Sequence, residues 1–104
     1  MFDLTESDKR RLMHATTVSG TDTVGVASSR IFTQNPDRLL AIIVNDSVNK
    51  IYLSLGANAV AGQGILLTSG GGSFSFGRGT DFPWLGEIHA ISDGAGSNVT
   101  IVEV

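Results

Sequence analysis

The chain of 104 residues contains no cysteine, few charged residues and no long apolar run. Without cysteine it can form neither disulfides nor thiolate metal sites, and it has no cysteine nucleophile. Its longest apolar run is far shorter than the ~18 residues of a membrane-spanning helix. The N-terminal sequence MFDLTESDKRR lacks the apolar core of a secretion signal. We therefore expect a soluble, unsecreted protein with no membrane partner.

Charge is scarce: Asp, Glu, Lys and Arg make up 16% of the residues, against ~25% in an average domain. The net charge is −3, and the basic run at residues 9–11 is offset by Asp3, Glu6 and Asp8. No basic stripe is available to neutralise phosphates, so we expect no nucleic-acid partner. The polar surface must come from residues such as the 11 serines and 9 threonines. That composition suits a β-rich domain whose surface meets other proteins.

Residues 1–29 read as a short helix followed by an extended arm. The sequence Thr5-Glu6-Ser7-Asp8 has the form of an N-terminal capping box, and the basic residues 9–11 suit the end of a helix of about ten residues. Leu4, Leu12 and Met13 give it a small apolar stripe. The Gly-, Ser- and Thr-rich segment 18–29 has alternating valines, which predicts an extended arm that pairs at the edge of a sheet.

From residue 30 onward the pattern is β throughout. Short apolar or alternating segments recur at close intervals, separated by turn sequences such as Asn35-Pro36-Asp37 and SGGG. Residues 51–55 alternate cleanly, and Phe74 and Phe76 fall on one face. We therefore expect residues 30–104 to form an all-β domain. A small antiparallel β-sandwich or jelly-roll-like barrel of about six or seven strands fits this pattern.

The segment LLAIIV at residues 39–44 is apolar at every position. Alternate residues of a strand point to opposite faces, so both faces of this strand need cover. The last strand has the same property, since Val99 and Ile101 oppose Val102 and Val104. A chain of 104 residues has few further residues with which to cover a second apolar face. We expect partner subunits, the N-terminal arm or both to cover the second face.

Catalytic signals are weak. Glu87 and His89 lie two apart on a predicted strand and share a face, as two metal ligands or an acid–base pair would. The only other histidine, His14, belongs to the N-terminal segment, and polar pairs of this kind are common on strand surfaces. No Gly-x-Ser-x-Gly elbow or phosphate-binding glycine motif occurs. We expect no catalytic residue, metal or cofactor.

The loop sequence Asp81-Phe82-Pro83-Trp84-Leu85 carries three large apolar residues. Such a loop is typical of an exposed interface anchor. Alternatively, Phe82 and Trp84 fold back as a plug over one end of the sandwich. In a ligand pocket, Tyr52 and Arg78 would be plausible wall residues.

The order of motifs from Arg38 to Glu103 resembles a group of small structural proteins of tailed-phage virions. The strand RLLAIIVNDS is followed by IYLSLG, then by GILLTSGGGSF, and finally by GEIHAISDGAGSNVTIVE. The resemblance covers about two-thirds of the chain and excludes its first 37 residues. It implies a non-enzymatic virion protein, with capsid decoration (cement) as the leading role. It also implies a homo-oligomer, commonly a trimer, bound to the major capsid protein or other virion proteins.

Two other functions stay open at this stage. One is a receptor- or glycan-binding module of a tail fibre or spike, with Phe82, Trp84 and Tyr52 as a stacking platform. The other is a small cupin-like metalloenzyme using Glu87 and His89. Under the leading interpretation, the residues expected to contact a partner are Phe2, Leu4, Leu12, Met13, Leu40, Ile42, Val44, Phe82, Trp84 and Val102.

Overall fold

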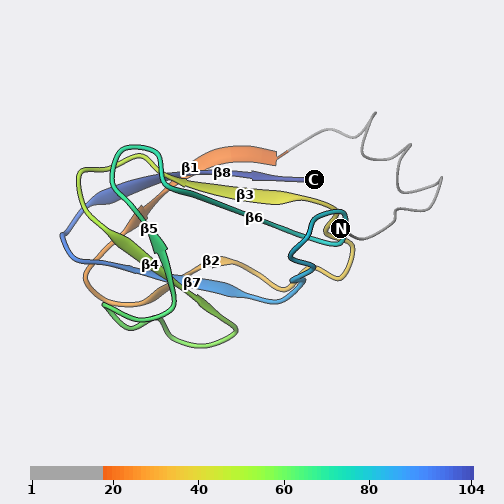
Figure 1. Ribbon diagram of the computed structural model, residues 1–104, viewed down its shortest axis with the longest axis horizontal. Helices are drawn as coiled ribbons and strands as arrows, with labels where there is room; N and C mark the ends of the chain where they lie inside the picture. Colours follow the sequence, from red (N-terminus) through yellow and green to blue (C-terminus); the bar gives the residue numbers. More distant parts are fainter. Residues whose placement is uncertain (1–17) are drawn as a thin grey trace.

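The computed structural model describes residues 18–104, which form two four-stranded antiparallel sheets stacked as two layers (Figure 1). The strands are β1 (Val18–Val24), β2 (Ser29–Phe32), β3 (Ala41–Asn45), β4 (Ile51–Leu55), β5 (Ile65–Leu67), β6 (Ser73–Phe76), β7 (Ile88–Ser92) and β8 (Ser97–Glu103). One sheet has the order β1-β8-β3-β6 and the other β2-β7-β4-β5. This is the strand order of a jelly roll, and the predicted all-β sandwich is confirmed.

The seven strands from β2 to β8 correspond to those expected in the C-terminal part. The predicted edge pairing of the arm is also confirmed, because β1 pairs antiparallel with β8 over its full length. The helix expected near the N-terminus lies outside the described residues, and so do the expected contact residues Phe2, Leu4, Leu12 and Met13.

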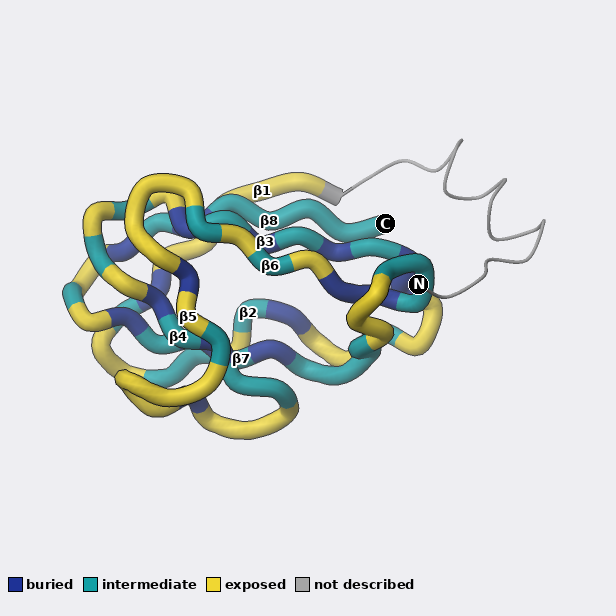
Figure 2. The backbone as a smooth tube through the Cα atoms, in the orientation of Figure 1, coloured by how far each residue is buried: buried dark blue, intermediate teal, exposed yellow. Residues whose placement is uncertain are grey.

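The core lies between the two sheets and follows from the alternation of the strands. In β4, Ile51 and Leu53 are fully buried, whereas Tyr52 between them is only partly so. Figure 2 shows buried and more exposed segments alternating along several strands. The buried apolar residues that form one cluster are Val24, Phe32, Ala41, Ile43, Ile51, Leu53, Leu67, Phe76, Ile88, Ala90 and Val99.

Two glycines are required where the chain turns closely past another backbone. Gly64, just before β5, has φ +89, and a Cβ there would lie 2.2 Å from the carbonyl oxygen of Leu53. Gly77, just after β6, has φ +127, and a Cβ there would lie 2.7 Å from the carbonyl oxygen of Leu39. Both positions combine an unfavourable φ for L-residues with a steric clash. Gly77 also fixes the start of the loop that carries Phe82, because its N–H donates to the Phe82 carbonyl at 2.9 Å.

Polar side chains close the sandwich where β3 ends. Asn45 is fully buried, and its Nδ2 donates to the carbonyls of Asn49 (2.7 Å) and Leu67 (3.0 Å). The hydroxyls of Ser92 and Ser97 lie 2.6 Å apart, and Asn49 Nδ2 donates to Ser97 at 3.0 Å. The buried groups therefore satisfy one another, as stability requires.

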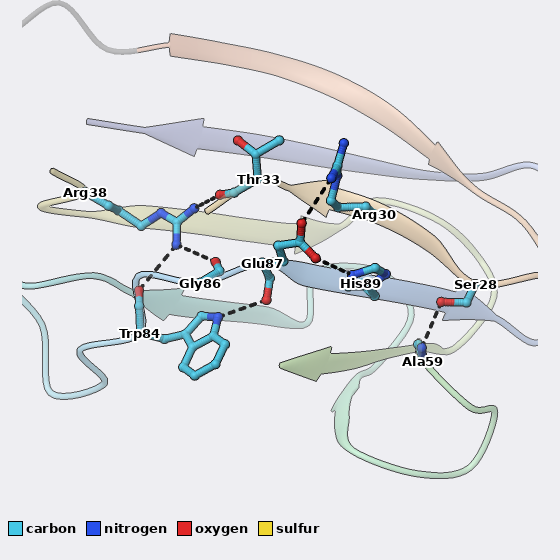
Figure 3. A network of polar contacts seen from close by, with 9 residues as sticks. All are labelled: Ser28, Arg30, Thr33, Arg38, Ala59, Trp84, Gly86, Glu87 and His89. Carbon is cyan, nitrogen blue, oxygen red and sulfur yellow. Dashed lines mark hydrogen bonds and ion pairs between the residues drawn. The ribbon is translucent and has the colours of Figure 1, made fainter. Parts of the chain in front are cut away.

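Arg38 closes the opposite end, just before β3 begins. Its side chain is fully buried, and its guanidinium carbon lies 5.6 Å from the ring centroid of Phe32 and 4.9 Å from that of Phe76. Nε donates to Glu103 Oε2 at 2.7 Å. The remaining donors reach backbone carbonyls, including that of Gly86 at 3.0 Å (Figure 3). A buried arginine is tolerated because its donors are paired and its plane lies against aromatic rings.

Candidate functional site

The outer face of the β1-β8-β3-β6 sheet carries an aliphatic stripe of four residues. Leu40, Ile42 and Val44 alternate with buried residues in and just before β3, so they point away from the core. Val102 of β8 lies directly beside Ile42 in the register. All four side chains are half-buried within the described chain. We call these four residues the outer stripe; each was expected to contact a partner.

Small hydroxyl side chains border the outer stripe on both sides. On the β6 side, Ser75 pairs with Ile42 and Ser73 with Val44. On the β1 side, Ser19 pairs with Val102, and Thr21 pairs with Thr100. The outward positions of β1, β8, β3 and β6 carry no charged side chain. The residues at these positions are Ser19, Thr21, Thr23, Asn98, Thr100, Val102, Ile42, Val44, Ser73 and Ser75. An apolar centre with an uncharged polar rim is the usual anatomy of a protein–protein interface.

Phe82 packs on the sandwich yet keeps part of its surface exposed. Its ring contacts Phe74 edge-to-face, with centroids 5.0 Å apart, and Phe74 stacks on Phe76 at 5.4 Å. Phe82 nevertheless remains 38% exposed. The ring of Phe82 therefore continues the row of Phe76 and Phe74 rings out of the core. It packs on the sandwich, as the plug alternative predicts, and it also keeps part of its apolar surface exposed.

Trp84 is held more firmly than Phe82. Its indole Nε1 donates to the carbonyl of Glu87 at 2.9 Å (Figure 3), and its ring packs against the core cluster. A Cβ on Gly86 would lie 2.6 Å from the ring, so Gly86 leaves the space that the indole occupies. The plug interpretation thus describes Trp84 well.

Trp84 also forms part of the wall of an open pocket of about 600 Å³. Its lining residues are Gln34, Pro36, Gly56, Pro83, Trp84, Leu85, Gly86 and Glu87. Tyr52 and Arg78, named from the sequence as wall residues, are not among them, and neither is Phe82. Tyr52 instead lies on the outer face of β4, beside Leu66 and Ile91. Tyr52 lies in one sheet, whereas Phe82 packs on the other. Phe82, Trp84 and Tyr52 therefore do not form the single stacking platform that the glycan-binding alternative required.

Glu87 and His89 do share a face, as their spacing predicted, and Arg30 joins them. Glu87 Oε1 lies 3.1 Å from His89 Nε2, and its Oε2 accepts from Arg30 Nη1 at 3.0 Å (Figure 3). The bond with His89, followed by that with Arg30, lowers the pKa of Glu87 below its ordinary value of 4.5. Within residues 18–104, no three His, Cys, Asp or Glu side chains lie together in a way that could hold a metal ion. Arg30 and Glu87 thus form an ion pair on the β2-β7-β4-β5 sheet, and His89 is hydrogen-bonded to the same carboxylate.

Comparisons with family models, curated proteins and solved structures find no match to this chain. In the described part of the chain, no helix has the length and apolar character needed to cross a bilayer.

Sequence reasoning missed the role of Arg38. It read this residue only as the start of an apolar strand, whereas the structure buries it at the end of the sandwich. Its partners Gly86 and Glu103 lie 48 and 65 residues away. No local pattern could have identified these contacts. The pocket residues Gln34 and Pro36 were missed for the same reason, because the turn that carries them meets the loop around Trp84 only in the fold.

Proposed function

We propose that this protein is a non-enzymatic structural protein of a bacteriophage virion, a capsid decoration (cement) protein that associates with copies of itself and binds the shell. Its partners are then the major capsid protein and neighbouring virion proteins, and its location is the capsid surface. The observation that carries the proposal is the uncharged outer face centred on the outer stripe. The order of motifs between Arg38 and Glu103 supports the phage assignment.

An uncharged face suits repeated attachment. The chain has a net charge of −3, so many copies on one shell repel one another if charged surfaces meet. Aliphatic side chains instead stabilise a contact by about 25 cal/mol for each Å² removed from water. Each contact can be weak, since linked copies on a shell gain avidity from multiple simultaneous contacts.

The test compares two matched substitutions. Ile42→Lys places a charge in the outer stripe, whereas Ile91→Lys places the same charge on the outer face of the other sheet, also in a central strand. Both isoleucines are half-buried. Binding to purified particles that lack the protein is measured by co-sedimentation. We expect Ile42→Lys to weaken binding at least tenfold and Ile91→Lys to bind like the wild type.

Equal binding by the two variants would show that the outer stripe is not part of the contact with the shell. The role itself is tested by the copy number in purified particles: hundreds indicate the shell, and a dozen or fewer indicate a neck, tail or vertex position.

The N-terminal segment is tested separately by deleting residues 1–17, which leaves β1 intact. We expect a folded sandwich that no longer binds particles; binding at wild-type affinity would exclude this segment from the attachment.

A second candidate is a receptor- or glycan-binding module, and the pocket beside Trp84 favours it. An indole wall together with Gln34 and Glu87 offers the apolar and polar groups that sugar rings require. Trp84 is the only tryptophan, so its fluorescence reports directly on the pocket. A saturable change on titration with glycans, weakened in Gln34→Ala, would support this function. Unchanged fluorescence across a panel of host glycans would count against it.

A further inference from the structure

Within residues 18–104, the outer edge of β1 differs from the other sheet edges. The edge strands are β1 and β6 in one sheet and β2 and β5 in the other. β5 has three residues and β6 has four, while β2 has four and is interrupted by a register shift. Short strands and bulges are common protections against edge-to-edge pairing. β1 is seven residues long and pairs with β8 in regular register throughout.

The sequence of β1 offers little protection as well. VSGTDTV contains no proline and no lysine, and Asp22 is its single charged residue. The residues from Ser19 to Thr23 are exposed. Among residues 18–104, no strand pairs with the outer edge of β1. The backbone along this edge is thus positioned to bond another strand. The Thr23 N–H donates to Asp22 Oδ1 at 2.8 Å, and pairing would exchange this local bond for one between strands.

We propose that β1 pairs antiparallel with β1 of a second copy, around a twofold axis at Thr21, so that two four-stranded sheets become one continuous sheet of eight. This inference concerns contact between copies and does not depend on the phage assignment.

The register follows from three requirements. Antiparallel hydrogen bonding and matching faces require the two paired residue numbers to have an even sum. A strand that spans residues 18–24 overlaps completely with its copy only when that sum is 42, which places Thr21 opposite itself. The next register, with a sum of 44, places Asp22 opposite Asp22, and opposed like charges destabilise a strand pair.

In the proposed register each residue meets a compatible partner. Asp22 lies opposite Gly20 of the second copy, so the two carboxylates are offset along the strands. Ser19 lies opposite Thr23, and Thr21 opposite Thr21, which gives cross-strand hydroxyl pairs of the type that stabilise sheets. The strand is therefore complementary to itself, which is why a second copy, rather than an unrelated strand, is the partner assigned here.

The absence of native cysteine makes a direct test possible. Thr21→Cys places two thiols opposite each other, where paired Cα atoms lie about 4.5–5.5 Å apart, within the range of a disulfide. Thr23→Cys is the matched control: it is the same substitution at an exposed site on the same face. Its two thiols would be offset by four residues, about 13 Å along the strand, too far for a bond.

Purified variants are oxidised under mild conditions, and covalent dimer is measured on non-reducing gels and by intact mass. We expect Thr21→Cys to dimerise at least tenfold faster than Thr23→Cys. Similar rates for both variants, or no dimer from either, would overturn the proposal. A second measurement uses the mass in solution across a concentration series. Thr21→Lys opposes two like charges at the axis and should weaken self-association at least tenfold more than Thr23→Lys; equal behaviour would also contradict the register.

Discussion

Replacing Arg38 with alanine should be among the most damaging single substitutions in the sandwich. The change removes an ion pair with Glu103 at 2.7 Å. It also removes donors to the carbonyls of Thr33 (2.7 Å), Gly86 (3.0 Å) and Trp84 (3.4 Å). The fold brings these groups together around one guanidinium, and among residues 18–104 no other side chain donates to them.

The magnitude follows from the groups left behind. Removing one partner of a buried pair costs about 3–5 kcal/mol, and an unsatisfied buried acceptor costs about 1–3 kcal/mol. Glu103 keeps 28% of its side chain exposed, so water can recover part of the loss at its carboxylate. We therefore expect a net loss of about 4 kcal/mol, a large fraction of the ~5–15 kcal/mol typical of a domain.

Urea unfolding followed by Trp84 fluorescence measures this loss, because the only tryptophan lies beside Arg38. With a slope of about 1–2 kcal/mol per M, the midpoint should fall by about 2–4 M. Arg38→Lys keeps the charge near Glu103 but lacks the planar fork of donors, so it should be intermediate. Glu103→Gln should cost about 1 kcal/mol because its site is partly exposed. A loss below about 1 kcal/mol for Arg38→Ala would refute the assigned role.

Three further predictions test other parts of the fold. Asn45→Asp keeps the shape of the side chain but loses the donors to two carbonyls, and should lower the free energy of unfolding by about 2–4 kcal/mol in urea. Gly77→Ala, with its backbone clash, should lower the melting temperature clearly more than Gly70→Ala, where φ is +71 but the space is open; equal shifts would contradict the packing. Because pairing lowers the pKa of Glu87, its contribution is complete above about pH 4.5 and is lost as pH falls through the lower value of the folded state. The difference in stability between wild type and Glu87→Gln should therefore shrink below pH 4.5, and a difference independent of pH would exclude the ion pair.

The β-sandwich could be predicted because its signals are local. Alternation in residues 51–55 placed Ile51 and Leu53 inside, and both are fully buried. The position of Phe74 and Phe76 on one face was equally visible in the sequence, and their rings stack, with Phe76 in the core and Phe74 partly buried against it. Turn residues between these segments then separated the strands. The sequence also showed that the strand after Arg38 has apolar side chains on both faces.

The candidate site was only partly predictable, because long-range contacts decide its details. Parity alone groups Leu40 with Ile42 on one face of their strand, but both faces are apolar, so only the fold shows that this face is the outer one. Whether Phe82 and Trp84 are exposed or packed against the sandwich could not be predicted, because this depends on where their loop meets Phe74 and Gly86. A loop with large apolar residues is compatible with both an anchor and a plug. In this fold Trp84 is held by a hydrogen bond, while Phe82 remains partly exposed.

The two outer faces of the sandwich differ in charge, and this difference predicts how the molecule is oriented. The β2-β7-β4-β5 face carries the cluster of Arg30, Glu87 and His89, whereas the outward positions of the other sheet carry no charge. Covering the charged cluster would strip water from three polar side chains, which costs free energy unless the partner replaces each contact. Covering the outer stripe costs little and removes aliphatic surface from water. The uncharged face should therefore meet protein and the charged face should meet solvent. If Ile91→Lys were the variant that lost binding while Ile42→Lys retained it, this orientation would be reversed.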